Sequence, residues 1–247
     1  MDVPGTHSAT SARGFTTTHW SVVINAQADD SPQAAQALEQ LCRNYWYPLY
    51  AYVRRQGRSP EDAQDLTQSF FARLLAGNSL GGVDRRKGKF RSFLLGAMNH
   101  FLADEWDRAR CQKRGGGQST LSLDETDAEE RYRLEPAEEL TAERIYERRW
   151  ALTLLEQVLR ELEAEFAQAG SADQFAVLKI FLLGDKGELS YADAAARTGM
   201  NENAVGVAIH RMRRRYGELF REAIAHTVSN PAEVDEEIAY LLCILGD

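Results

Sequence analysis

The sequence predicts an all-α protein, and three observations lead to that fold class. Residues that favour helices, namely Ala, Leu, Glu, Gln and Arg, dominate the composition. The 18 Gly and 6 Pro residues fall mostly at breaks between segments. Between those breaks, apolar residues recur at three- and four-residue spacing, which is the period of a helix with one buried face.

Cap signals divide the N-terminal half into helices. Ser31 and Pro32 form an N-cap and a first-turn proline for one long helix, which Pro48 is expected to bend. Ser59 and Pro60 repeat this design at the start of the next helix. The predicted elements are a flexible start over 1–15, helices over 16–27, 31–57, 59–77 and 90–114, and a loop rich in Gly and charge over 77–89.

The middle of the chain differs in composition from its flanks. Residues 115–144 are acidic and hold few large apolar residues, so we interpret them as a mobile linker. Amphipathic helices are predicted after it, over 144–170 and 171–184. The tail, 226–247, is predicted to form one more amphipathic helix, which packs on its own domain or binds a regulator or the polymerase. Its apolar stripe is Val234, Ile238, Leu241, Leu242 and Leu245.

A helix-turn-helix is predicted between the 171–184 helix and the 226–247 tail. Ser190 caps a short helix, Gly199 supplies a tight turn, and Asn201 caps a longer second helix. Small residues, Ala194 and Ala195, stand where the two helices would cross. This is the pattern of a unit whose second helix enters the DNA major groove.

Basic residues gather in two places, although the chain carries a net charge of -8. A run of arginines lies in the second helix of the helix-turn-helix. A charge run is usually a solvated helix face, but the neighbouring motif favours DNA contact. The other group surrounds the 90–114 helix and includes Arg85 and Arg86. Its aromatic residues, Phe90, Phe93, Phe101 and Trp106, either bind unpaired bases or belong to the core.

Composition also excludes several classes of protein. No apolar run is long enough to span a bilayer, and the N-terminus lacks the apolar core of a secretory signal. The three cysteines form no CxxC pair, so we expect a reducing cytoplasm and no disulfide framework or metal site. No phosphate-binding glycine loop, nucleophile motif or second carboxylate pair is present, so we expect no enzyme, no catalytic residues and no cofactor.

Three motifs in order carry a resemblance to a known family. They are "DAQDLTQSFFARLL", "KFRSFLLGAMNHFLADEWDRAR" and "LSYADAAARTGMNENAVGVAIHRMRRR". Together, over roughly residues 30–225, they resemble a bacterial extracytoplasmic-function (ECF) sigma factor of the sigma-70 family. The resemblance implies two helical domains joined by the acidic linker. Its implied partners are bacterial core RNA polymerase and promoter DNA, with a Ser/Thr kinase or an anti-sigma factor left open.

The resemblance also implies a role for each segment. Residues 16–114 would bind the polymerase clamp and open the promoter −10 element, and residues 145–225 would read the −35 element in the major groove. The loop 77–89 would hold a flipped base, and residues 115–144 would run toward the RNA exit channel. The polymerase-binding residues carried over are Asp62, Asp65, Leu66, Gln68 and Phe71.

The DNA contacts are carried over in the same way, with departures from the family pattern. Gly96 and Asn99 stand where Arg is common, and Gly206 and Ala208 replace basic residues. The −10 candidates are Lys87, Lys89, Arg91, Asn99, His100, Arg108 and Arg110. The −35 candidates are Asn203, Ala204, Val207, His210, Arg211, Arg213, Arg214 and Arg215.

A third departure lies in the polymerase-binding helix. Gln64 and Ser69 replace acids of the family string, and Thr67 replaces an apolar residue. Phosphorylation of Thr67, or of Ser69, would restore negative charge facing a basic polymerase surface. We therefore hypothesise a kinase switch at Thr67. The alternative is that Thr67 is a half-buried helix residue.

Other functions remain open at this stage. A helix-turn-helix regulator would use the same DNA-reading unit without contacting the polymerase clamp, and it would normally dimerise on a palindrome. An adaptor that binds a kinase or the polymerase would contact no DNA. Promoter-directed transcription with core polymerase alone separates a sigma factor from the regulator.

Overall fold

The computed structural model describes residues 32–76, 88–111, 125–133, 140–183 and 189–246. Within these ranges every regular element is a helix, which confirms the predicted fold class. The helix predicted over 16–27 lies outside the described residues, as does most of the 77–89 loop. The helices are α2 (Pro32–Arg55), α3 (Pro60–Ala76), α4 (Phe90–Cys111), α5 (Glu125–Arg133), α6 (Ala142–Gln168), α7 (Ala172–Leu178), α8 (Ile180–Leu183), α9 (Tyr191–Thr198), α10 (Glu202–Ala225), the 3₁₀ turn η3 (Pro231–Glu233) and α11 (Val234–Gly246).

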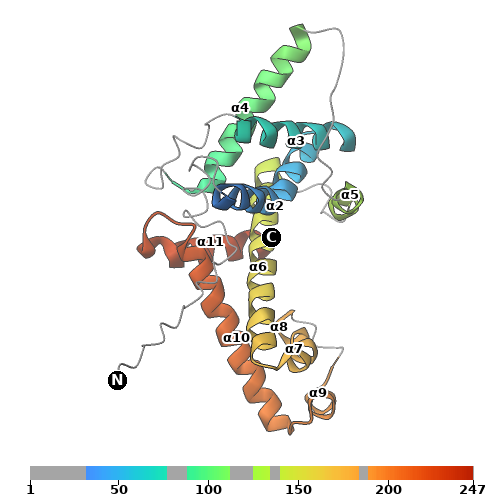
Figure 1. The fold of residues 1–247 in the computed structure, drawn as a ribbon, viewed down its shortest axis with the longest axis vertical. Coiled ribbons are helices and arrows are strands. Elements are labelled where there is room, and N and C mark those ends of the chain that lie inside the picture. Colours follow the sequence, from blue (N-terminus) through green and yellow to red (C-terminus); the bar gives the residue numbers. More distant parts are fainter. Residues whose placement is uncertain (1–31, 77–87, 112–124, 134–139, 184–188, 247) are drawn as a thin grey trace, which may run out of the picture.

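Helix α6 runs through the middle of the molecule along its long axis (Figure 1). It packs against α2 in one half of its length and against α10 in the other. Its buried large side chains recur every four residues and so line one face: Tyr146, Trp150, Leu154, Val158 and Leu162. As a result, α4 projects toward one end of the molecule, and α9 with the start of α10 occupies the other (Figure 1).

Helix α2 supplies the core of the N-terminal half. Its predicted stripe is buried at Leu41, Tyr45, Leu49, Tyr52 and Val53, and the helix continues through Pro48. Polar and aromatic contacts fasten it to α6. The Gln157 amide donates a buried hydrogen bond to Asn44, and the rings of Tyr52 and Tyr146 meet edge to face with centroids 6.4 Å apart. The two predicted domains are thus packed together along this seam.

Helices α3 and α4 complete the N-terminal bundle. Ser59 is the N-cap that the sequence predicts, since its Oγ accepts a hydrogen bond from the Asp62 backbone N–H at 3.0 Å. On α4, Leu94, Met98 and Phe101 are buried. An ion pair of 2.9 Å between Arg73 and Asp104 joins the two helices at the surface.

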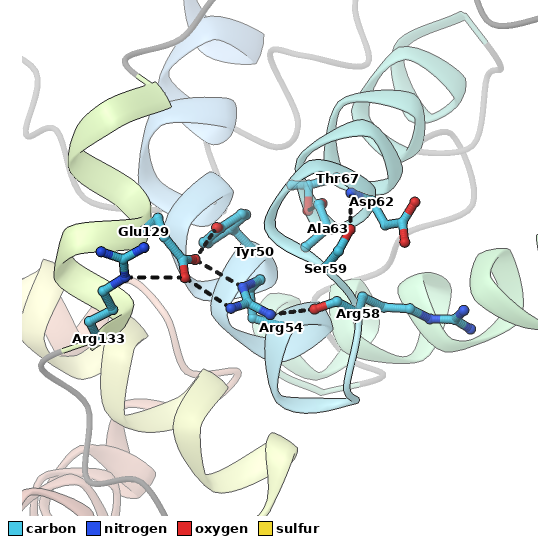
Figure 2. A network of polar contacts seen from close by, with 9 residues as sticks. All are labelled: Tyr50, Arg54, Arg58, Ser59, Asp62, Ala63, Thr67, Glu129 and Arg133. Carbon is cyan, nitrogen blue, oxygen red and sulfur yellow. Dashed lines mark hydrogen bonds and ion pairs between the residues drawn. The ribbon is translucent and has the colours of Figure 1, made fainter.

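The acidic linker contains a helix that the sequence analysis does not expect. In α5, Glu129 accepts two hydrogen bonds of 2.9 Å from the Arg54 guanidinium and one of 2.8 Å from Tyr50 (Figure 2). The hydrogen bonds from Arg54 are the main reason that the pKa of Glu129 is lowered. The expectation of a mobile linker is therefore wrong at α5, because partners about 75 residues earlier hold it on α2.

The helix-turn-helix forms as predicted. The Ser190 side chain accepts from the Asp193 backbone N–H, and the Asp193 carboxylate accepts in return from the Ser190 backbone, which completes a capping box. Gly199 ends α9 with φ at 69°, and the Asn201 side chain accepts from the Ala204 N–H at 2.8 Å. Small Ala194 and Ala195 are buried. Local sequence signals account for the whole unit.

The C-terminal helix α11 packs across α6 and α10, so it belongs to the half of the molecule that holds the helix-turn-helix. Its buried face is formed by Val234, Glu237, Leu241 and Ile244. The predicted apolar stripe is therefore wrong at one position: Leu242 is 58% exposed. A carboxylate, Glu237, points inward instead.

Two glycines of the helix-turn-helix give a matched test of its backbone. Gly199→Ala should lower the free energy of unfolding by about 1 kcal/mol, because alanine resists the left-handed conformation. Gly206→Ala should raise it by about 0.5–1 kcal/mol, since Gly206 is inside a helix. A Cβ at Gly206 would meet only the Tyr191 ring, at 3.7 Å. Urea unfolding followed by circular dichroism measures both, and changes of the same sign would contradict this assignment of the turn.

Candidate nucleic-acid and polymerase interfaces

The start of α10 presents several of the predicted −35 contact residues on one open surface. Asn203, Val207, His210 and Arg211 line a shallow hollow together with Glu202 and with Tyr191 of α9. Val207 is 51% exposed, so it offers apolar surface to this hollow. Ala204 is half-buried beside them. The structure thus brings Asn203, Val207, His210 and Arg211 together.

A ring contact fixes one wall of this hollow. The Tyr191 ring meets Phe181 edge to face, with centroids 5.4 Å apart. Gly206 forms the floor, and the absence of its side chain leaves the hollow open beside Tyr191. We call the surface of this hollow the recognition surface. It offers an amide, an imidazole, one guanidinium and apolar surface, which suits a mixture of base-edge and phosphate contacts.

The remaining arginines of the run are engaged within the protein. Arg213 donates to the Phe181 carbonyl oxygen at 2.7 Å, and Arg214 pairs with Glu218 at 2.9 Å. Arg215 makes a two-pronged ion pair with Glu165 of α6, at 2.6 and 2.9 Å. Hydrogen bonding to Glu165 is also the main reason that the pKa of Arg215 is raised. Arg215 thus joins α10 to α6, which argues against the DNA contact expected of it.

On α3, acidic side chains lie on the exposed face. Asp62, Asp65 and Ser69 are exposed, and Leu66 and Gln68 are half-buried. Four of the five predicted polymerase contacts therefore reach the surface. Phe71 does not, because it is buried in the core and stacks edge to face on Phe70, with ring centroids 5.5 Å apart.

A phosphorylation switch at Thr67 requires an exposed hydroxyl, but the structure buries this residue. Thr67 is 0% exposed, and its hydroxyl donates to the Ala63 carbonyl oxygen at 2.7 Å on the inner side of α3 (Figure 2). A kinase needs an accessible hydroxyl, so Thr67 is out of reach in this conformation. Ser69 lies on the exposed face of the same helix.

The candidate −10 residues separate into two groups along α4. At its start, Lys89 and Arg91 form ion pairs with Glu237 of α11, and Arg91 is only 3% exposed. Further along, Asn99 and His100 are exposed, and Asn99 accepts a hydrogen bond from Tyr52. Arg108 is exposed and pairs with Glu105 at 2.6 Å. Lys87 and the side chain of Arg110 lie outside the described residues.

The aromatic residues of α4 divide in the same manner. Phe90 and Phe101 are buried in the core, and Phe93 packs partly against it. Trp106 is 53% exposed, with the guanidinium of Arg58 4.9 Å from its ring centroid. A groove between α3 and α4 is lined by Phe93, Ala97, His100 and Phe101, among others. Trp106 and this groove are the surfaces on α4 where bases could stack.

Two further searches cover the described part of the chain. No group of three or more His, Cys, Asp or Glu side chains in it could hold a metal ion. Within the same residues, no helix has both the length and the apolar character needed to cross a bilayer.

These surfaces define a multi-helix protein of the helix-turn-helix class, with an acidic helix face at the other end of the molecule. A family model described as ECF sigma factor matches residues 32–215, which includes α3, α4, α9 and the first part of α10. The chain therefore belongs to the ECF sigma factor family, whose members are transcription factors. Neither the curated proteins nor the solved structures contain a match to it.

The burial of Thr67 can be tested with a pair of aspartates. Thr67→Asp should lower the free energy of unfolding by about 3 kcal/mol or more, because it places a carboxylate where the structure offers no water. Ser69→Asp, two residues away on the exposed face, should change it by less than about 0.5 kcal/mol. Urea denaturation of both variants gives the comparison. Equal stabilities would show that Thr67 reaches solvent.

Proposed function

We propose that this chain is an alternative sigma factor that binds bacterial core RNA polymerase in the cytoplasm and directs transcription initiation at its own set of promoters. The observation that carries the proposal is the single family match that spans both halves of the chain. The geometry supports it, because α3 exposes an acidic face and because α4 and the start of α10 expose separate surfaces for two promoter elements.

The polymerase surface under this proposal is the outer face of α3. Asp62 and Asp65 are exposed there, three residues apart and hence on one side of the helix. Their carboxylates suit a basic receiving surface, while the half-buried Leu66 and Gln68 add contact area beside them. Phe71 supports this face from within the core and does not touch the partner.

The DNA surfaces under this proposal lie at opposite ends of the molecule (Figure 1). The outer half of α4, with Asn99, His100 and Trp106, would meet the −10 element. The start of α10, with Asn203, Val207 and Arg211, would meet the −35 element in the major groove. Described basic side chains at these surfaces, such as Arg108 and Arg214, already hold acidic partners, so polymerase binding is expected to supply much of the affinity of the promoter complex.

Reconstitution with purified bacterial core polymerase tests the proposal. The chain should bind core polymerase and initiate transcription from promoters recovered by selection with the holoenzyme. Asp62→Asn with Asp65→Asn should weaken core binding by roughly 3- to 30-fold, the range expected for two exposed ion pairs. Glu163→Gln, an exposed charge change on α6, is the control and should have no effect. A chain that binds a palindromic DNA site without polymerase would instead be a helix-turn-helix regulator.

The arginine run provides a sharper test of DNA contact. Arg211→Ala should weaken DNA binding by the holoenzyme and lower the slope of log K against log salt by about 0.9, the value for one phosphate contact. Arg215→Ala should leave that slope unchanged and lower the stability of the free chain, because Arg215 joins α10 to Glu165. If the two substitutions change the slope equally, the division of the run into DNA-facing and internal arginines is wrong.

Phosphorylation is a finer part of the proposal. Added phosphate on α3 would strengthen its contact with a basic polymerase surface. Ser69 is the exposed hydroxyl, so we favour it over Thr67, which a kinase could modify only after local opening of α3. Mass spectrometry of the chain isolated from bacteria would locate the phosphate. Modification at Thr67 would show that α3 opens in the cell.

A further inference from the structure

A buried cluster of charge joins the start of α4 to the inner face of α11. Glu237 receives both Arg91 and Lys89, and the Arg91 and Glu237 side chains are only 3% and 1% exposed. The Lys89 side chain retains 34% exposure. The basic start of α4, which the family resemblance assigns to DNA, is therefore neutralised by a carboxylate from the far end of the chain.

Aromatic residues close this cluster from the other sides. The Arg91 guanidinium lies 4.6 Å from the centroid of Trp150 on α6, and Lys89 Nζ lies 5.4 Å from that of Tyr240 on α11. The hydroxyl of Tyr146 donates to the Arg91 carbonyl oxygen at 2.9 Å. Every one of these contacts comes from α6 or α11, the helices that pack with α10. The half of the chain that carries the helix-turn-helix thus holds the start of α4.

Stability alone does not account for an acid at position 237. The neighbouring inward positions on α11 are apolar, and a buried ion pair is commonly no more stabilising than well-packed apolar side chains. Burial raises the pKa of Glu237, but Arg91 and Lys89 together outweigh that effect and lower it. Glu237 is therefore an anion. Unlike an apolar residue at this position, it pairs with two cations.

The other acids at the start of α11 face elsewhere. Asp235 is exposed and pairs with Arg221 of α10 at 2.5 Å, and Glu236 is exposed as well. Of these three acids, Glu237 is the one that pairs with cations at the start of α4. Asp235 consequently provides a matched control, because it carries the same charge on the same turn without touching α4.

We propose that α11 is an autoinhibitory clamp in which Glu237 takes the place that DNA phosphates would occupy at Lys89 and Arg91. The inference rests on the proposed function. DNA reaches the buried Arg91 only after α4 has parted from α11 and α6, and the same step releases Lys89 from Glu237. The clamp leaves Asp62 and Asp65 of α3 exposed, so core polymerase can bind first and DNA second.

The first experiment measures binding of the full-length chain to a fluorescein-labelled, mixed-sequence DNA duplex by fluorescence anisotropy at several salt concentrations. Glu237→Gln should bind about tenfold more tightly than the unmodified chain at low salt. Its salt slope should be steeper by about 1.8, the value for two further phosphate contacts. Asp235→Asn changes the net charge equally and should alter the affinity by less than about twofold, with no change in slope.

Equal behaviour of Glu237→Gln and Asp235→Asn would overturn the clamp. Core polymerase binding by the same three proteins is measured in parallel. A chain that fails to bind polymerase contradicts the proposed function, whatever its DNA affinity. A chain that binds polymerase but gains nothing from Glu237→Gln contradicts the clamp alone.

A distance measurement tests the clamp without disturbing its charges, and so covers the case in which Glu237→Gln fails to fold. Spin labels at Ser92→Cys and Glu236→Cys, both exposed positions, report the α4–α11 distance by pulsed electron resonance, with Cys42, Cys111 and Cys243 replaced by Ala. The free chain should show one short distance. Saturation with core polymerase and DNA should replace it with a longer one. An unchanged distance in that complex would overturn the proposal.

Discussion

The rest of the structure depends on α6, because this one helix is buried along both halves of its length. Tyr146 and Trp150 face the N-terminal bundle, and Leu162 and Glu165 meet the region of α10. A helix of 27 residues is about 40 Å long, so its length sets the separation between the groove beside α4 and the recognition surface on α10. Any rearrangement that separates these two surfaces must first release one half of α6.

Three arginines in the described part of this acidic chain serve as internal counterions. Arg54 holds α5 through Glu129, Arg215 holds α10 through Glu165, and Arg91 meets Glu237 of α11. Each pair joins elements that are distant in sequence, and each guanidinium is at least partly withdrawn from water. The basic run of α10 therefore has two roles. Arg211 remains exposed at the start of α10, while Arg215 joins that helix to α6.

Local signals in the sequence predict the helices and their caps, but contacts between distant segments do not show in them. Ser190, Gly199 and Asn201 each act within a few residues, so the helix-turn-helix could be predicted in full. Helix α5 could not, because its partner Arg54 lies about 75 residues away. Thr67 and Glu237 illustrate the remaining difficulty. A helical period fixes which residues share a face, but a single polar residue does not reveal which face turns inward.

The seam between the two halves combines ring contacts with polar pairs, and this combination bears on how the halves can part. Asn44 with Gln157 and Arg91 with Glu237 are buried, yet all four side chains recover hydrogen bonds from water when the seam opens. An apolar seam of equal area would lose its full hydrophobic contribution instead. The apolar side chains of the seam belong to one core cluster that runs through both halves, so opening the seam also exposes apolar surface and needs a partner that binds the opened form. Because phosphates and carboxylates present the same chemistry to Arg91 and Lys89, DNA can compensate for the charge that departs with α11. Under the clamp proposal, opening the seam and binding DNA at α4 are the same exchange of one anion for another.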